Sequence, residues 1–289
     1  MSTVPVIAID GPSASGKGTV AEEVARALGF HYLDSGALYR LVALAAAREG
    51  IDAGDEAKLA AIAVRLPVRF EGEDIFLEDE RVTDAIRTEE NSFAASRVAA
   101  LPGVRRALLD RQQSFRKPPG LVAEGRDMGS IVFPDAALKV FLTASPEARA
   151  ERRYKQLKEK GIAATLAALL QDLRERDARD ATRSVAPLKQ SPGARPLDTT
   201  SMSAEQAAAL VVLELFQGDK GFGLESGVDD DVVHVHADDF GGDHFAGAHF
   251  LAREAFFDKG GETILGSYCG GCIRHKETCI LPVQGDGVR

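Results

Sequence analysis

Short apolar runs alternate along the chain with stretches whose apolar residues recur every three or four positions, and this alternation continues to about residue 217. The apolar runs predict buried strands at residues 4–10, 30–33, 120–124 and 137–142. The helical periodicity predicts helices at residues 19–28, 36–48, 55–66, 91–100, 104–115, 145–160, 162–178 and 203–216. Because strands and helices alternate, we expect an α/β fold of three layers, with a parallel sheet between helices.

Between residues 64 and 88 the hydrophobic pattern changes from helical periodicity to short β-like pieces. Val68-Arg69-Phe70 and Ile75-Phe76-Leu77 are short β-like pieces, and the residues between them are polar turn formers. We therefore predict a small antiparallel insert that lies outside the main sheet.

The first strand leads directly into Gly11-Pro12-Ser13-Ala14-Ser15-Gly16-Lys17-Gly18-Thr19, and a helix follows. An ordinary Gly/Ser turn is the alternative, but strand, glycine-rich turn, lysine and helix in this order favour a phosphate-binding loop. Its backbone N–H groups and the helix N-terminus would face phosphate oxygens, and Lys17 would add a positive charge. The hydroxyl that usually follows the lysine is displaced by Gly18 to Thr19, a form typical of nucleoside-monophosphate kinases.

Charge and composition limit the partners. The formal net charge is −9, and residues 218–289 hold 6 of the 35 basic and 13 of the 44 acidic residues, so the first 217 residues are nearly neutral. Such a protein is a poor general nucleic-acid binder, and an anionic substrate must be met by local arginines. No apolar run approaches the ~18 residues of a membrane span, and no leader precedes the first strand. We expect a soluble cytoplasmic monomer.

Polar residues follow two of the predicted strands. Ser35, Tyr39 and Arg40 come after the second strand, and the strand 120–124 ends in Glu124-Gly125-Arg126-Asp127. Ligands of open α/β sheets bind at the carboxyl ends of the strands. A solvated helix charge is the alternative for Arg40, but the polar cluster around it favours ligand contact.

Several segments together resemble bacterial cytidylate kinases. They are the loop at residues 11–19, Leu33-Asp34-Ser35-Gly36-Ala37-Leu38-Tyr39-Arg40, Ile86-Arg87-Thr88, Ala95-Ser96-Arg97-Val98-Ala99, Glu124-Gly125-Arg126-Asp127-Met128-Gly129, Glu175-Arg176-Asp177 and Ala186-Pro187-Leu188. The resemblance runs from residue 4 to about 216. It implies a kinase domain at residues 1–217 with a five-stranded parallel sheet, a β insert (64–88) that closes on the monophosphate and a helical lid (150–185). It also implies ATP as donor with Mg²⁺, and CMP and dCMP as acceptors.

The resemblance also implies roles for individual residues. The loop residues Gly11 to Thr19 would bind ATP, with Arg152 and Arg153 as weaker candidates. The acceptor nucleotide would contact Ser35, Tyr39, Arg40, Ser96, Arg105, Arg126, Asp127, Arg176 and Asp180. The catalytic residues would be Lys17, Arg126, Arg176 and Arg183, and Mg²⁺ would be held mainly through phosphates and water, with Glu124 and Asp127 nearby.

Within that set, Ser96, Arg105 and Asp127 would read the base. Cytosine offers an amine donor and two acceptors, so a carboxylate and an arginine suit it and would reject uracil. Without the resemblance, Arg105 would be interpreted as an exposed arginine. Some of the many arginines at residues 152–183 should form helical ion pairs, such as Asp172 with Arg176.

Residues 218–289 differ from the rest of the chain. They hold 14 of the 28 glycines, 5 of the 6 histidines and all 3 cysteines. Cys269, Cys272, His275 and Cys279 are residue types that bind zinc, although their spacing matches no standard zinc motif. A small metal-binding module, a disordered tail and sequence foreign to the gene's proper frame remain alternatives.

Two other functions compete with phosphorylation of CMP. The chain could be a kinase for another monophosphate, such as AMP or UMP. It could also be a nucleotide-dependent switch, although it contains no Asn-Lys-x-Asp motif for guanine and its arginine-rich lid suits phosphoryl transfer better.

Overall fold

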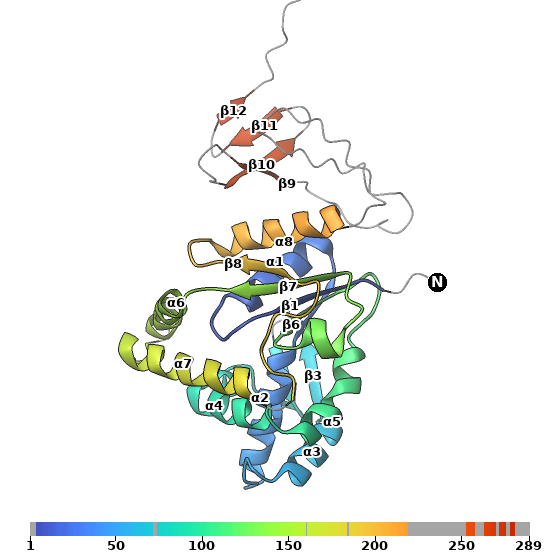
Figure 1. Cartoon of the computed structure of the whole chain (residues 1–289), viewed down its shortest axis with the longest axis vertical. Helices are drawn as coiled ribbons and strands as arrows, with labels where there is room; N and C mark the ends of the chain where they lie inside the picture. Colours follow the sequence, from blue (N-terminus) through green and yellow to red (C-terminus); the bar gives the residue numbers. More distant parts are fainter. Residues whose placement is uncertain are drawn as a thin grey trace, which may run out of the picture. The chain divides into compact units, whose positions relative to one another are not determined.

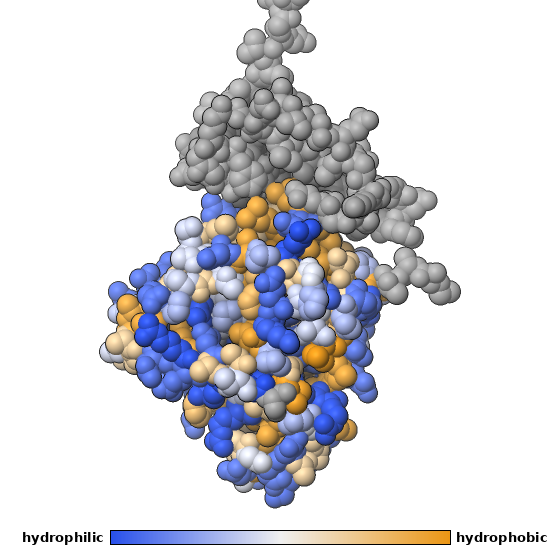
Figure 2. Space-filling model, in the orientation of Figure 1, coloured by the Kyte–Doolittle hydropathy of each residue, from blue (hydrophilic) through white to orange (hydrophobic). Residues whose placement is uncertain are grey.

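The computed structural model describes residues 4–71, 74–159, 161–183 and 185–218, and the strand segments 253–257, 263–269, 272–275 and 278–280, with side chains described through residue 215. The chain divides into two units, Met1–Ala208 and Ala209–Arg289, which are described separately. The visible face of the first unit is mostly hydrophilic, with apolar residues scattered over it (Figure 2).

A five-stranded sheet forms the centre of the first unit. All neighbours run parallel in the order β2-β6-β1-β7-β8. The strands are β1 (Val6–Asp10), β2 (His31–Asp34), β6 (Leu121–Gly125), β7 (Leu138–Thr143) and β8 (Arg195–Asp198). Val6, Ile7, Ala8 and Ile9 of the central strand β1 are fully buried, which explains their uninterrupted apolar run. The predicted five-stranded parallel sheet is confirmed.

The position of the fifth strand was not predicted. β8 pairs only with β7, at the edge of the sheet, and its sequence Arg195-Pro196-Leu197-Asp198 is largely exposed. A strand that is solvated and contains a proline has no apolar run to indicate it, and an edge is where a sheet tolerates proline.

Helices cover both faces of the sheet, and Figure 1 shows α1 on one face and α2 to α5 on the other. The α-helices are α1 (Lys17–Leu28), α2 (Ser35–Arg48), α3 (Glu56–Arg65), α4 (Glu89–Val98), α5 (Pro102–Gln113), α6 (Pro146–Glu159), α7 (Leu166–Thr182) and α8 (Ala204–Gly218). Short helical turns lie at η1 (Ala85–Arg87) and η2 (Met128–Val132), and η2 is a π-helix. The largest apolar core lies between the sheet and α2, α3 and α5.

Capping residues set where the helices begin. Ser145 accepts a hydrogen bond from the Ala148 N–H (3.2 Å), with Pro146 at the first helical position, as predicted for α6. The predicted start of the next helix at residue 162 is wrong. The side chain of Thr165 caps α7 by accepting from the Ala168 N–H (3.3 Å), so this helix begins at Leu166 and continues to Thr182.

The insert is an antiparallel sheet of three strands, β3 (Val68–Glu71), β4 (Asp74–Leu77) and β5 (Glu80–Arg81). Ile75 and Leu77 of β4 are buried and join the main apolar core. The third strand was not predicted, because its two charged residues give no alternating pattern.

The described part of the second unit contains an antiparallel sheet in the order β12-β11-β10-β9. Its strands are β9 (Arg253–Phe257), β10 (Thr263–Cys269), β11 (Cys272–His275) and β12 (Thr278–Ile280). Cys269 pairs with Cys272 in the register of β10 and β11. The side chains of the four zinc candidates Cys269, Cys272, His275 and Cys279 lie outside the described residues. None of the described helices is long and apolar enough to span a bilayer.

Candidate active site

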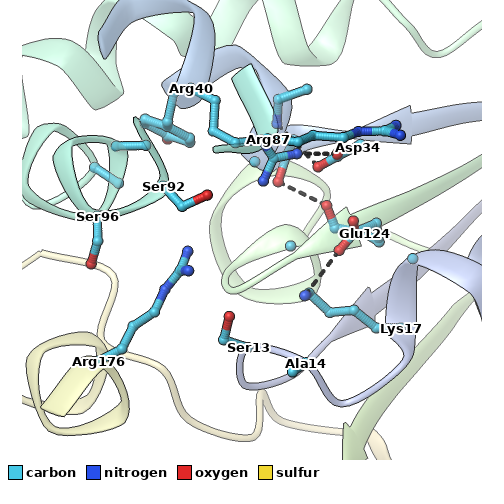
Figure 3. A pocket seen from close by; sticks show the side chains of 18 of the residues that line it. Ser13, Ala14, Lys17, Asp34, Arg40, Arg87, Ser92, Ser96, Glu124 and Arg176 are labelled. Carbon is cyan, nitrogen blue, oxygen red and sulfur yellow. Dashed lines mark hydrogen bonds and ion pairs between the residues drawn. The ribbon is translucent and has the colours of Figure 1, made fainter. Parts of the chain in front are cut away.

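A cleft of about 1400 Å³ opens at the carboxyl ends of the sheet strands. Its walls come from the loop after β1, the start of α2, helix α4, the end of β6 and the helices α6 and α7. Figure 3 shows Lys17, Glu124, Asp34 and Arg40 along one wall, with Arg176 reaching in from α7. Residues that are far apart in sequence therefore line the same cleft.

The loop at residues 11–19 has a tight backbone. Gly16 (φ 92°) and Ala14 (φ 57°) both adopt the left-handed region, and a side chain at Gly11 would collide with the carbonyl of Leu142. Helix α1 begins directly at Lys17, so its free N–H groups face the loop. Of the nine predicted ATP-binding residues, the cleft is lined by Ser13, Ala14, Lys17, Gly18 and Thr19, while Gly11, Pro12, Ser15 and Gly16 shape the loop behind it.

The lysine of the loop is paired with a carboxylate. Lys17 Nζ lies 3.3 Å from Glu124 Oε2 at the end of β6. Burial, and secondly the charge of Arg126, lower the pKa of Lys17 to about 8, while burial raises the pKa of Glu124. Lys17 is thus still mostly charged at neutral pH, and phosphate oxygens beside it would raise its pKa further.

Ser35 and Arg40, two residues of the predicted cluster after β2, have partners at the carboxyl ends of the strands. Arg40 pairs with Asp34, which also accepts from the Ala37 N–H (3.0 Å), and the Ser35 hydroxyl donates to the Glu124 carbonyl (2.8 Å). The solvated alternative for Arg40 is therefore wrong. Asp34 was not predicted as a site residue, although its place at a strand end was the available signal.

The three predicted base-reading residues all line the cleft. Arg105 is 9% exposed, so the exposed alternative is wrong. It pairs with Asp127, donates to the Ala99 carbonyl (2.9 Å), and stands over the Tyr39 ring at 5.5 Å. The Ser96 hydroxyl is buried and has no hydrogen-bond partner among the described residues, which leaves it available to a ligand.

Arginines from α2, from the end of β6 and from α7 and the segment after it line the cleft, and we call them the arginine wall: Arg40, Arg126, Arg176 and Arg183. Arg126 Nε donates to Asp180 Oδ2 (2.9 Å), and Arg183 Nη1 lies 3.9 Å from Asp180 Oδ1. Burial, and then the charge of Arg126, lower the pKa of Arg176 to about 10. In the part of the chain that the structure describes, Arg40, Arg176, Arg179 and Arg183 each have a buried N–H group without a hydrogen-bond partner. Such donors fit the oxygens of a phosphate.

Two expectations for arginines of this region are wrong. Asp172 and Arg176, both described, do not form the predicted ion pair, because Arg176 turns into the cleft (Figure 3). Arg152 does not line the cleft. It donates to the carbonyl of Ser15 (3.0 Å) and to the hydroxyl of Thr199 (3.2 Å), and so holds the loop from behind.

The helices α6 and α7 also contact α4 across the cleft. Arg153 Nε donates to Glu89 Oε1 (2.9 Å), and the guanidinium of Arg179 stands 4.9 Å from the Phe93 ring centroid. Arg153 lines the cleft, but its guanidinium is already paired with the Glu89 carboxylate. These pairs could not be predicted from sequence spacing, because each joins residues more than sixty positions apart.

A buried carboxylate missed by the sequence reasoning supports the site. Asp10, at the end of β1, accepts from the N–H groups of Met128 (2.8 Å) and Gly129 (2.9 Å) at the start of η2. Burial raises the pKa of Asp10 to about 6. Asp10 thus holds in place the backbone directly after Arg126 and Asp127.

A phosphate loop ending in Gly-Lys-Gly-Thr, facing an arginine-lined wall in a parallel α/β fold, defines a P-loop kinase of the nucleoside-monophosphate type. The family model "Cytidylate kinase" matches residues 7–217. The chain belongs to the cytidylate kinase family.

Among its relatives, a cytidylate kinase of Polynucleobacter asymbioticus is 60% identical over 73% of this chain and 96% of its own. One of Bordetella pertussis is 59% identical over 72% of this chain and 93% of its own. A solved gluconokinase from Sinorhizobium meliloti 1021 shares 16% identity over 75% of this chain and 94% of its own, and its TM-score of 0.40 is too low to support an argument.

Proposed function

We propose that the chain is an ATP-dependent kinase that phosphorylates CMP and dCMP to CDP and dCDP. Its membership of the cytidylate kinase family supports the reaction class. The single observation that carries the choice of base is the buried pair of Arg105 and Asp127, in the cleft that Ser96 also lines.

The pair of Arg105 and Asp127 matches cytosine by its hydrogen-bonding types. The carboxylate accepts from the exocyclic amine, and the guanidinium and the serine hydroxyl donate to the ring acceptors. Uracil presents a carbonyl and an N–H where cytosine presents an amine and a bare nitrogen. Two buried groups would then face the wrong partner, which is a strong basis for rejection.

Catalysis in this proposal consists of positioning and charge neutralisation. The acceptor phosphate is already an anionic nucleophile at neutral pH, so no general base is required. Lys17 lies on the donor phosphates, while Arg126, Arg176 and Arg183 hold the acceptor phosphate and the charge that spreads between the two. Ser35, Tyr39, Arg40 and Asp180 orient the acceptor, and the lid helices exclude water.

We include Mg²⁺ in the proposal, and it fits one of its two candidate residues. Glu124 is a buried carboxylate beside Lys17 and close to Gly18 of the loop, and its oxygen ligands are of the type Mg²⁺ prefers. Asp127 is left out of the Mg²⁺ site, because in this proposal its carboxylate pairs with Arg105 and accepts from the cytosine amine. When bound, Mg²⁺ neutralises charge on the donor phosphates, and Glu124 would hold it through water.

We propose further that the protein acts in the cytoplasm as a monomer and does not bind nucleic acid. The near-neutral charge of residues 1–217 supports the last point. We also propose residues 1–217 as the kinase domain and 218–289 as a separate segment. Truncation after Phe216 tests this division, with activity and bound zinc as the two measurements.

A coupled assay of ADP production with CMP, dCMP, UMP, AMP and GMP tests the function. We expect multiple turnovers with CMP and dCMP, and little ADP without an acceptor. Comparable turnover of UMP or AMP would reject the cytosine assignment. Production of ADP that does not depend on any acceptor would favour a nucleotide-dependent switch.

A further inference from the structure

One arginine of α6 connects the phosphate loop to α7. Arg149 is 3% exposed, and its Nη1 donates to the Ser13 carbonyl (3.1 Å) while its Nε donates to the Ala144 carbonyl (3.1 Å). The same guanidinium forms a two-pronged ion pair with Asp177 of α7, at 3.1 and 2.6 Å. Among the described residues that line the cleft, neither Arg149 nor Asp177 is found. The group therefore acts through others and not on a nucleotide.

On the loop side, Arg149 holds a strained piece of backbone. Ala14 has a left-handed φ of 57°, a conformation that persists in a non-glycine residue only when its surroundings impose it. Arg149 bonds the carbonyl of Ser13 on one side of Ala14, and Arg152 bonds the carbonyl of Ser15 (3.0 Å) on the other. Ala14 also packs against the small apolar cluster of α6 and α7. The shape of the loop thus depends on these helices.

On the α7 side, Asp177 has neighbours along the helix that are proposed to bind the acceptor nucleotide. Arg176 precedes it and Asp180 follows it by about one helical turn, and both line the cleft. Asp180 in turn accepts from Arg126 Nε at 2.9 Å. Fixing Asp177 therefore fixes the rotation of α7 about its axis, and with it the place of Arg176 and Asp180.

We propose that Arg149 is a positioning residue that couples the phosphate loop to α7. A nucleoside triphosphate bound to the loop then favours the orientation of α7 that holds the acceptor monophosphate. Contacts join Ser13 to Arg149 and Arg149 to Asp177, and the same helix α7 carries Asp180, which accepts from Arg126. The inference rests on the proposed function, because it requires two nucleotides in one cleft. Its measurable quantity is the factor by which one nucleotide strengthens binding of the other.

Titration calorimetry of CMP, with and without a non-hydrolysable ATP analogue, measures this factor. In the unaltered full chain we expect the analogue to tighten CMP binding. Arg149→Lys keeps the charge but cannot form the two-pronged pair, and should lower the coupling factor about tenfold while the analogue still binds. Steady-state kinetics should show the matching split, with the KM for CMP at saturating ATP rising and kcat changing less.

Asp177→Asn is the second variant, since its side chain is 27% exposed and touches no loop residue, which makes a folding failure less of a concern. It should lose the same coupling, and the double variant should lose no more than either single one. Arg174→Lys is the matched control. Arg174 also joins α7 to α6, through an exposed pair with Glu147 (3.3 Å), but has no contact to the loop, so coupling should stay unchanged.

The outcomes separate the two proposals. Unaltered protein that binds no CMP in either condition rejects the proposed function and this inference with it. CMP binding that the analogue does not affect, or coupling that survives in Arg149→Lys and Asp177→Asn, rejects the inference alone. An equal loss in Arg174→Lys would also reject it, since any loosening of α6 and α7 would then suffice.

Discussion

The loop after β1 and the arginine wall both suit phosphate, but they are built differently. The loop uses backbone N–H groups, a helix N-terminus and one lysine, all within nine consecutive residues. The wall uses side chains from α2, β6, α7 and the segment after α7, including Arg40, Arg126, Arg176 and Arg183. The loop is thus formed by local sequence and carries one charge, that of Lys17. The wall is formed by tertiary packing and carries several positive charges.

The largest effect should come from removing the single charge of the loop. Lys17→Ala should lower kcat about 10³-fold, the upper range for loss of one donor to a developing charge. The neighbouring Arg126 and Arg40 are already paired, with Asp180 and Asp34 respectively, so neither is free to take its place. A coupled ADP assay measures the loss, with the exposed Lys58→Ala as control. A loss of kcat of less than tenfold would show that the loop does not depend on a single charge.

Base selectivity should belong to the wall side alone. Asp127→Ala should lower the ratio of kcat/KM for CMP over UMP about 10²-fold, since it removes the acceptor for the cytosine amine and leaves Arg105 unpaired. The KM for ATP should change by less than about twofold. Asp135→Ala removes an exposed, paired aspartate and serves as control. Unchanged selectivity would reject Asp127 as a base reader.

The pH dependence should also distinguish the two sides. The pKa of Lys17 is lowered to about 8, so in the free enzyme its charge is present below pH 8 and lost above it. We expect kcat/KM for ATP to fall above about pH 8, tenfold per pH unit, while kcat falls only at higher pH because bound phosphates favour the charged lysine. Glu124→Gln removes an attraction that raises this pKa, so it should move the fall to lower pH. A fall that stays in place in this variant would contradict the assignment to Lys17.

The smallest effect should come from the loop backbone. Ala14→Gly relieves a left-handed alanine but adds freedom to the unfolded chain, and the balance should stabilise the protein by about 0.5 kcal/mol. Urea unfolding without nucleotide measures it. Ala53→Gly, at a residue whose φ is not positive, should instead destabilise by a similar amount. A destabilised Ala14→Gly would mean that the conformation of Ala14 is not strained.

The same contrast explains what could be predicted from sequence. The loop, the strand β1 and helix α1 follow from consecutive residues, so their pattern is visible in the chain. The pairs Lys17–Glu124, Arg149–Asp177 and Arg153–Glu89 join distant positions, and no spacing indicates them. Arg149 in particular was not predicted to have a role, because a buried arginine that joins two elements and a solvated arginine cannot be told apart in sequence.

Elements exposed to solvent were the hardest to place. β8 and β5 have no apolar alternation, since β8 lies at a sheet edge and β5 consists of two charged residues. The family resemblance supplied the number of sheet strands, which periodicity alone did not. The start of α7 was misplaced because the cap at Thr165, rather than the apolar pattern, determines it.

The crowding of like charges on the arginine wall bears on the lifetime of the protein. Arg126 and Arg176 each disfavour the other's charge, and several of the buried N–H groups there have no partner within the described residues. Nucleotide phosphate would relieve both, so a molecule that holds nucleotide should open locally less often than one that does not. Resistance to proteases would then rise with the supply of its own ligands, and idle molecules would be degraded first.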